Sequence, residues 1–313
     1  MLTLDFLNVG DGDAILIRES ERNYTILVDT GRPHIEFTKG SKRRACINHL
    51  MQMGIQQIDL MVLTHLHFDH IGGALSVLRH IPVTRLMAAY LPPEDASWIL
   101  APNSEEKTII GMVDALNLYQ DIICAARKSG TQCERATRET EHVTDKLSIR
   151  PVPADDALLA RQKQHFDAMY HGEAMPEDVL YAISKERNIS SLRLRLTYAD
   201  KRILLTGDSY AAYWENDPEE PCDILKVPHH GDDKSMTQKL LSRLQPEYAV
   251  ISCENAASPK KERPAPQVLS MLLDQVPHVL CTENRLFERF PATTQECIRI
   301  EIDTNGTITH TCI

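Results

Sequence analysis

Residues 61–73 of the chain read MVLTHLHFDHIGG. The first letters complete a short apolar run, residues 58–63, of the kind that forms a buried β-strand, and Gly72-Gly73 allow close packing where a helix begins. Between them stand three histidines and an aspartate within six positions: His65, His67, Asp69 and His70. The stretch therefore predicts a strand that delivers four potential metal ligands at its carboxyl end.

The spacing of these four side chains divides them into two pairs. Alternate side chains of a strand point to the same side, so His65 and His67 can reach one cation, while Asp69 and His70 turn the other way as the helix begins. Imidazole and carboxylate ligands suit Zn²⁺, and also accept Mn²⁺ or iron. Two cations ~3.5–4 Å apart can hold a hydroxide between them, which is hydrolase chemistry. The alternative, scattered polar residues of a loop, fits less well because only 13 of 313 residues are histidine.

The motif is similar to the H-x-H-x-D-H signature of the metallo-β-lactamase superfamily. Three further parts of the chain resemble that family in the same order: residues 6–14 with 26–31, residues 204–208 (LLTGD) and residues 223–231 (DILKVPHHG). They resemble in particular the hydrolase-like domain of ComEC-type DNA-uptake proteins and the phosphorylcholine esterases. The resemblance implies an α/β fold of the αββα sandwich type, one domain over residues 1–313, and metal-dependent hydrolysis.

Hydrophobic patterning along the chain agrees with two β-rich halves and helices between them. A polar, helix-prone segment at residues 154–187 interrupts the second half, and is either a functional lid or a surface excursion without a role. Helices are expected near residues 42–53, 70–79, 104–128, 235–244 and 265–274. Strands are expected at residues 2–8, 13–18, 24–28, 58–63, 84–89, 147–152, 192–198, 202–206, 223–227, 247–252, 278–281, 297–302 and 307–312.

The family resemblance implies a role for each residue of the metal motifs. His65 and His67 would bind a first metal, Asp69 and His70 a second, and Asp208 would bridge both. One or two Zn²⁺ ions are expected, with Mn²⁺ as the alternative. The metals would lower the pKa of bound water from ~15.7 towards ~7, and Asp69 would orient the resulting hydroxide.

The adjacent histidines His229 and His230 offer one more ligand. In an extended backbone they point apart, so only one of them can ligate the same metal as His65. We assign His229 as that ligand. His230 is then expected to face the substrate as a proton donor or oxyanion stabiliser.

The chain departs from the family pattern near residue 263. Related enzymes commonly carry a segment resembling H-P-H-P-x-V-L, whereas residues 263–269 read RPAPQVL. The second metal would then have only Asp69, His70 and Asp208, which implies weaker binding, a shell completed by water, or a single-metal enzyme. Arg263 is either a substrate contact, since its planar guanidinium suits phosphate or carboxylate, or a surface arginine before a helix.

Two polar residues before the strand that leads to Asp208 are further candidates for substrate contact. Asn188 and Ser191 occupy a position like that of an Asn/Ser segment in ComEC-type domains. The leading expectation is hydrolysis of a phosphoester or phosphodiester. The alternatives are hydrolysis of a carboxylic ester, lactone or amide, and, in another class, a non-catalytic metal-binding or redox module.

The net charge of the chain argues against long nucleic acids as binding partners. The net charge is −10, from 34 basic and 44 acidic residues, so the chain lacks the basic surface that long nucleic acids require. No signal peptide and no apolar run near 18 residues is apparent in the sequence, which predicts a protein without a membrane segment that is cytoplasmic or leaves the cell by a route that the sequence does not show. The expected partner is a small molecule, with an anionic group in the leading case.

Overall fold

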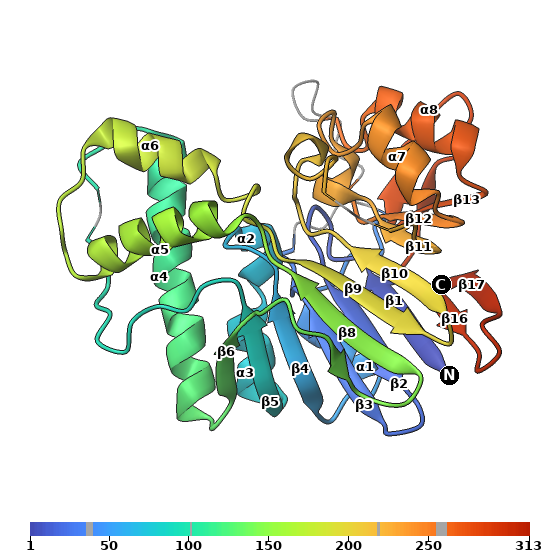
Figure 1. Ribbon diagram of the computed structural model, residues 1–313, viewed down its shortest axis with the longest axis horizontal. Coiled ribbons are helices and arrows are strands. Elements are labelled where there is room, and N and C mark those ends of the chain that lie inside the picture. Colours follow the sequence, from blue (N-terminus) through green and yellow to red (C-terminus); the bar gives the residue numbers. More distant parts are fainter. Residues whose placement is uncertain (36–39, 101, 218–219, 255–261) are drawn as a thin grey trace.

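The computed structural model describes residues 1–35, 40–100, 102–217, 220–254 and 262–313. Two β-sheets lie face to face, and helices cover the outer surface of each (Figure 1). The expected αββα sandwich is confirmed by this arrangement. Strands of both sheets bring the polar motifs of the sequence to one edge of the sandwich.

The first sheet has eight strands in the order β17-β16-β1-β2-β3-β4-β5-β6. Its first part, from β17 to β3, is antiparallel, and β3 to β6 run parallel. The strands are β1 (Leu2–Leu7), β2 (Ile15–Glu19), β3 (Tyr24–Val28), β4 (Ile58–Leu63), β5 (Val83–Ala88), β6 (Gln132–Arg135), β16 (Cys297–Ile302) and β17 (Ile308–Cys312).

The second sheet has seven strands in the order β13-β12-β11-β10-β9-β8-β7, parallel from β13 to β10 and antiparallel from there on. A separate hairpin pairs β14 (Glu283–Asn284) with β15 (Thr293–Thr294). The strands of the sheet are β7 (Glu141–His142), β8 (Leu147–Val152), β9 (Arg193–Tyr198), β10 (Lys201–Leu205), β11 (Ile224–Lys226), β12 (Tyr248–Ile251) and β13 (His278–Cys281).

Eight α-helices flank the sheets in the described residues. Helices α4, α5 and α6 gather at one end of the sandwich, and α7 and α8 cover the second sheet (Figure 1). The helices are α1 (Cys46–Gln52), α2 (Phe68–Ile71), α3 (Ala74–His80), α4 (Lys107–Lys128), α5 (Asp156–Tyr170), α6 (Glu177–Lys185), α7 (Gln238–Leu244) and α8 (Pro266–Gln275).

Three apolar cores hold these layers together. The side chains of β4 alternate between two of these cores. Val62 packs in the core between the two sheets, whereas Met61 and Leu63 pack in the core between the first sheet and its helices. A third core packs Leu240 of α7 and Leu272 of α8 against the second sheet. A strand buried on both faces reads as a continuous apolar run, which is why residues 58–63 were recognisable in the sequence.

Helix α4 agrees with the expectation that the chain has no uninterrupted apolar run near 18 residues, because Asp114 and Asp121 lie within it. Among the described residues it is the one helix whose length and composition would let it cross a membrane. Its apolar side is buried in the protein, where Met112, Leu116, Tyr119 and Ile123 belong to the core beneath the first sheet. This packing accounts for its composition without a membrane.

The helix expected over residues 70–79 is two helices, α2 and α3, separated by Gly72 and Gly73. A Cβ atom on Gly73 would lie 2.4 Å from the carbonyl oxygen of Thr30, so the glycine permits a close approach of two loops. The short polar strands β6, β7, β14 and β15 were not expected, because they lack the apolar alternation that identifies longer strands. The segment at residues 154–187 forms α5 and α6.

Candidate metal centre

The metal motifs converge because each follows the carboxyl end of a strand. The H-x-H-x-D-H motif follows β4, Asp208 follows β10, and His230 follows β11. A tight approach supports the arrangement: a Cβ atom on Gly12 would lie 2.4 Å from the carbonyl oxygen of Asp69, which accepts a hydrogen bond from the backbone of Asp13. Only glycine fits at position 12 without displacing the loop that carries Asp69.

The side chains form two groups of donor atoms that share Asp208. One group contains His65, His67 and Asp208, and the other contains Asp69, His70, Asp208 and His230; within each, the donor atoms lie within 4.8 Å of one another. Asp208 Oδ2 is 3.2 Å from His70 Nε2, 3.5 Å from His230 Nε2 and 3.8 Å from His65 Nε2. One carboxylate thus faces both groups, as a bridging ligand must.

Unpaired polar atoms show that these groups fit divalent cations. His70 Nε2, His230 Nε2 and Asp208 Oδ1 are buried and have no hydrogen-bond partner among the described residues. Buried polar atoms are normally satisfied, so three unpaired atoms on residues of one donor group call for a ligand. Imidazole nitrogens and carboxylate oxygens are donors that Zn²⁺, Mn²⁺ and iron accept.

Within the part of the chain that it describes, the structure places the ring of His230, and not that of His229, in a close donor group. His230 belongs to the second donor group, whereas His229 joins none of the close donor groups found in the described residues. The expectation assumed an extended backbone, but residues 228–231 form a turn in which His229 and His230 have φ values of 47° and 56°. In this left-handed conformation the simple alternation of side chains does not hold.

The two groups also differ from expectation in their number of donors. The second group has four, because His230 supplies the nitrogen that was expected to be missing. The first group has three, His65, His67 and the shared Asp208. The group with fewer donors is therefore the first, whereas the sequence led us to expect fewer donors in the second.

Further acids orient the histidines from behind. Asp29 Oδ2 lies 2.7 Å from His70 Nδ1 and also accepts a hydrogen bond from the Thr64 hydroxyl at 2.7 Å. His230 Nδ1 lies 2.9 Å from the carbonyl oxygen of Ser252. Both contacts leave Nε2 as the nitrogen that faces the donor group. Asp29 stands in the opening motif of the sequence, but its role was not recognised there.

A buried ion pair lies beneath the second group. The ammonium group of Lys226, on β11, pairs with Asp13, which lies between β1 and β2, and both side chains are almost fully buried. Lys226 also donates a hydrogen bond to the carbonyl oxygen of Gly207 at 3.3 Å. Asp13 Oδ2 is 3.8 Å from His70 Nδ1, so this pair connects both sheets directly behind the metal ligands.

Replacing Asp29 with asparagine should lower metal affinity about 10–100-fold, the usual effect of losing the partner of a ligating histidine. The amide keeps the shape of the side chain but removes the charge that holds the His70 ring. Competition with a fluorescent chelator measures the affinity. Asp59→Asn is a matched control, because Asp59 also contacts the backbone of a strand, at Thr25, but lies away from the donor groups. Unchanged affinity in Asp29→Asn would contradict the orienting role.

The histidines and carboxylates shift one another's pKa. Burial lowers the pKa of His67 to about 3, with the nearby Arg187 acting in the same direction. Burial would also lower the pKa of His230, but Asp208 and Asp11 outweigh it and raise the pKa to about 10. Asp208 and Asp29 likewise raise the pKa of His70 well above its usual value, against the effect of burial. Cation binding to the second group is therefore expected to displace protons, whereas the two histidines of the first group are neutral.

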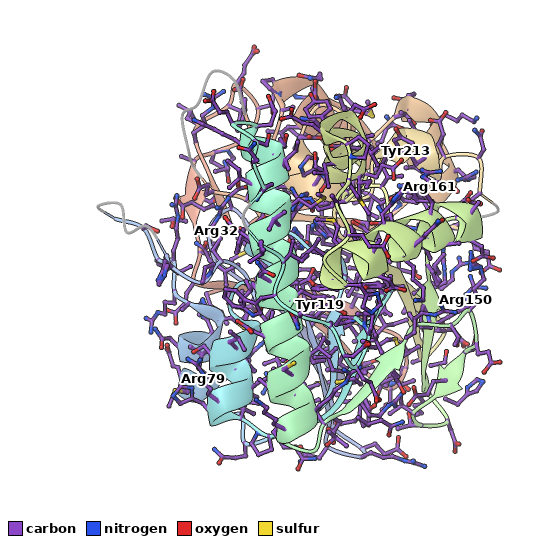
Figure 2. The ribbon with its side chains drawn as sticks, turned by 90° about the vertical axis from the view of Figure 1, so that its left-hand side faces the viewer. Arg32, Arg79, Tyr119, Arg150, Arg161 and Tyr213 are labelled. Atoms are coloured by element: carbon purple, nitrogen blue, oxygen red, sulfur yellow. The ribbon has the colours of Figure 1, made fainter. Side chains whose placement is uncertain are left out.

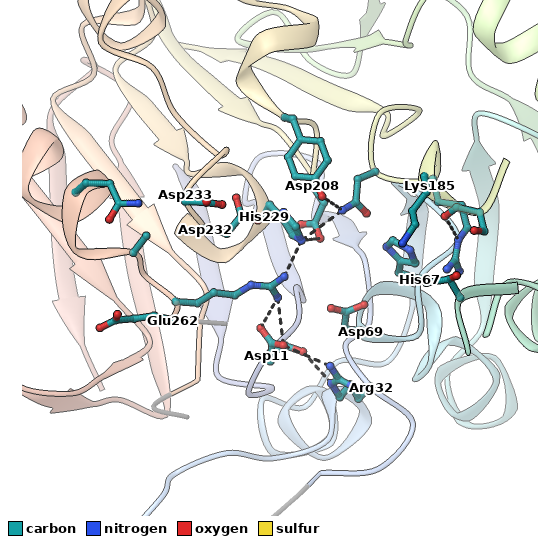
Figure 3. Close-up of a pocket in the computed structure, with 18 of the residues that line it drawn as sticks. Asp11, Arg32, His67, Asp69, Lys185, Asp208, His229, Asp232, Asp233 and Glu262 are labelled. Atoms are coloured by element: carbon teal, nitrogen blue, oxygen red, sulfur yellow. Dashed lines mark hydrogen bonds and ion pairs between the residues drawn. The ribbon is translucent and has the colours of Figure 1, made fainter. Parts of the chain in front are cut away.

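The donor groups open into a cavity of about 630 Å³, here called the metal-site pocket, lined among others by His67, Asp69, Asp208 and His229. Figure 3 shows these side chains around the pocket. The segment at residues 154–187 contributes to it, because Ser184, Lys185 and Arg187 at its end line the wall. The pocket is large enough for a small organic molecule.

Of the three residues expected to contact the substrate, Arg263 and Asn188 line the metal-site pocket and Ser191 does not. Arg263 lines the metal-site pocket but is already paired: it donates to both carboxylate oxygens of Asp11, at 3.0 and 3.2 Å, and lies 2.7 Å from His229 Nε2. Asn188 also lines the pocket, and donates to the Tyr210 hydroxyl at 3.0 Å. Ser191 lines a different cavity; its hydroxyl accepts a hydrogen bond from the backbone nitrogen of Asp208 at 3.2 Å.

Arg187 is one of the basic pocket residues that the sequence did not indicate. Arg187 is buried, and its hydrogen bonds in the described structure go to two backbone carbonyl oxygens, those of Ser184 and Leu66, at 3.3 and 3.4 Å. No carboxylate lies within ion-pair distance of it in the described residues. Burial lowers its pKa to about 10, partly offset by Asp69. An arginine beside an asparagine gives no sequence signal for this placement, which results from the end of α6 folding over the histidine motif.

A family model described as Metallo-beta-lactamase superfamily matches residues 7–254. ComE operon protein 3 of Bacillus subtilis (strain 168) is 27% identical over 295 residues, and the match covers 90% of this chain and 32% of that protein. This chain thus spans about a third of the length of that relative.

Solved structures are similar to this chain at low sequence identity. The metallo-beta-lactamase fold protein YhfI from Bacillus subtilis is 9% identical, with 99% of both chains covered and a TM-score of 0.49. A diphosphatase of the PhnP family is 13% identical, with 94% of this chain and 100% of that chain covered and a TM-score of 0.46. At such identities and scores, neither structure carries an argument about the substrate.

Proposed function

Because the chain belongs to the metallo-beta-lactamase superfamily and brings metal-binding side chains together, we propose that it is a metal-dependent hydrolase and that it cleaves a phosphoester or phosphodiester bond in a small anionic molecule. The observation that carries the proposal is Arg187, a buried cation at the wall of the metal-site pocket without a carboxylate partner among the described residues. A buried charge is costly unless it is paired. An anionic group of the substrate would supply the missing partner.

The position of Arg187 favours phosphate in particular. Arg187 donates a hydrogen bond to the carbonyl oxygen of Leu66, which places it beside the histidine motif. Its positive charge helps to lower the pKa of His67 in the first donor group. Guanidinium groups bind phosphate oxygens through two parallel hydrogen bonds. A phosphoryl group between Arg187 and the donor groups would be held on two sides. Arg263 is the weaker candidate, since Asp11 already occupies its guanidinium group.

Acidic side chains of the pocket favour a small substrate over a long nucleic acid. Asp232, Asp233 and Glu262 line the metal-site pocket away from the donor groups, and the whole chain carries a net charge of −10. A polyanion that extends through the pocket would meet these acids, which is unfavourable. A molecule with one or two charges can pair with Arg187 and avoid them.

We assign the metal ligands in two sites. His65 and His67 would hold a first cation, and Asp69, His70 and His230 a second, with Asp208 shared. When bound, such cations lower the pKa of water from ~15.7 towards ~7 and offset the charge that develops at the attacked centre. Zn²⁺ is our proposal for the metal, with Mn²⁺ and iron as alternatives that the same ligands accept. Plasma emission spectrometry of protein purified without chelator identifies it.

His229 takes the role that was expected for His230. Its ring lines the metal-site pocket, and its Nδ1 lies 2.6 Å from Asp232 Oδ2, while Nε2 lies 3.8 Å from Asp208 Oδ2. Nε2 also accepts hydrogen bonds from Arg263 and Asn188, at 2.7 and 3.3 Å, so His229 would carry a proton to a leaving group once a bound substrate has displaced these donors. Asp69, with an accessible carboxylate in the second group, would orient the attacking water.

Replacing Arg187 with glutamine should raise KM for bis-(p-nitrophenyl) phosphate about 10–150-fold, the value of a charge-assisted hydrogen bond worth ~1.5–3 kcal/mol. KM for the neutral p-nitrophenyl acetate should stay within about threefold, because no charged partner is lost. Arg187→Lys should restore part of the loss. Initial rates for both substrates over a range of concentrations give these values.

Arg263→Gln is the matched control, since it removes a pocket arginine that Asp11 already pairs. It should change KM for the two substrates to the same extent. If Arg187→Gln also affects both substrates equally, the phosphoester proposal fails, and hydrolysis of a carboxylic ester, lactone or amide becomes the better account.

A further inference from the structure

A second cavity, of about 690 Å³, lies behind the wall of the metal-site pocket. Four arginines from four separate segments line it, and we call it the arginine pocket: Arg138, Arg150, Arg161 and Arg193. Figure 2 shows Arg150, Arg161 and Tyr213, which also lines the cavity, on one side of the view, with Arg32 and Arg79 on the other. Such a gathering is unexpected in a chain whose net charge is −10.

The four arginines of this pocket differ in whether a carboxylate forms an ion pair with them. Arg161 pairs with Glu186 at 2.5 Å, and Arg193 with Asp217 at 2.7 Å. Arg138 lies 3.1 Å from Asp156, but that carboxylate is 86% exposed, so the pair is weak. Arg150 has no ion pair within the described residues.

The backbone register places a second arginine beside Arg150. On neighbouring antiparallel strands β8 and β9, Arg150 lies directly opposite Arg195. Like charges in such a cross-strand pair destabilise a sheet. A bound anion at Arg150 would relieve this repulsion.

Apolar groups complete the lining. Pro151, Val152 and Leu158 line the cavity beside the arginines, and the exposed ring of Tyr213 stands at its edge. Guanidinium groups favour phosphate, and apolar walls favour a hydrocarbon or aromatic body. We propose that the arginine pocket binds a small phosphate monoester with an apolar or aromatic body, at a site separate from the metal-site pocket.

The two pockets share a wall one chain thick. Ser184, Lys185, Arg187 and Asn188 line the metal-site pocket, whereas Glu186 and Ser191 of the same segment line the arginine pocket. The segment after β10 also contributes to both pockets: Asp208 lines the metal-site pocket and Ser209 lines the arginine pocket. Ser191 accepts the hydrogen bond from the Asp208 backbone, so an occupant of the arginine pocket contacts a residue that positions the shared carboxylate.

The test titrates phenylphosphonate, a phosphate monoester analogue that cannot be hydrolysed as an ester, into the metal-loaded full chain by calorimetry. Two equivalents should bind, one in each pocket. Arg150→Gln should weaken one of them about 10–150-fold, the effect of losing a charge-assisted hydrogen bond, and Arg150→Lys less so. Arg79→Gln, which removes an exposed arginine of α3, should leave both unchanged.

The two proposals fail separately in this experiment. Arg187→Gln should weaken the other equivalent; if it does not, the phosphoester proposal fails while the arginine pocket stands. If one equivalent binds and only Arg187→Gln weakens it, or if Arg150→Gln and Arg79→Gln act alike, the arginine pocket is not an anion site. Inorganic phosphate should bind the arginine pocket at least tenfold more weakly; equal binding would overturn the apolar part of the proposal. Since Arg150 forms no ion pair in the described structure and lies opposite Arg195, the melting temperature of Arg150→Gln should be no lower than that of the parent protein.

Discussion

Replacing Asp208 with alanine is expected to remove most bound metal and to lower turnover by more than about 10³-fold. Its carboxylate faces both donor groups, so the change deprives each of a ligand at once. Metals stabilise developing charge by several kcal/mol, and about 4 kcal/mol corresponds to 10³ in rate. Plasma emission spectrometry and initial rates measured on the same sample give the two quantities.

Asp233→Ala is the matched control for this variant, because Asp233 also lines the metal-site pocket but stands outside both donor groups. It should keep its metal and react within a few-fold of the parent rate. Circular dichroism should show both variants folded. An Asp208→Ala protein that retains its full metal content would contradict the shared position of this carboxylate.

The adjacent histidines should separate metal binding from proton transfer. His230→Ala is expected to lose the cation of the second group, because its Nε2 is one of the four donors. His229→Ala should keep both cations and lose about 10²–10⁴-fold in rate, the usual contribution of a general acid. Metal content and turnover of the two variants, measured side by side, distinguish the roles.

The opposite result has a definite meaning. If His229→Ala loses metal and His230→Ala keeps it, the turn at residues 228–231 rearranges when cations bind, and the assignment from the extended backbone would be restored. A rate loss in His229→Ala that free imidazole rescues would support proton transfer, since the added base can occupy the vacated space.

The sandwich fold was predictable because strand β4 is recognisable both from its apolar residues and from the histidine motif that follows it. Residues 58–63 are apolar enough to read as a doubly buried strand, and the histidine motif follows directly. The short strands β6 and β7 were not predictable, since they are polar and gain their place from pairing with β5 and β8. Such pairing is a tertiary effect that local patterning does not report.

The metal site was predictable in its residue types but not in all its geometry. The family signature identifies His65, His67, Asp69 and His70, and the donor groups contain all four. The choice between adjacent histidines depended on backbone dihedral angles, and a left-handed pair is rare for residues other than glycine. Arg187 could not be found, because nothing in its neighbours reveals that it is buried beside a histidine from a distant segment.

The ion pair between Lys226 and Asp13 bears on how the metal site is assembled. It joins a loop of one sheet to a strand of the other, so the two halves of the site are fastened together by the protein's own charges. Removing either partner would leave the other charge buried and unpaired, at a cost of about 3–5 kcal/mol. The ligands are therefore preorganised: incoming cations find their coordination shells already built, and metal affinity is not spent on bringing the sheets together.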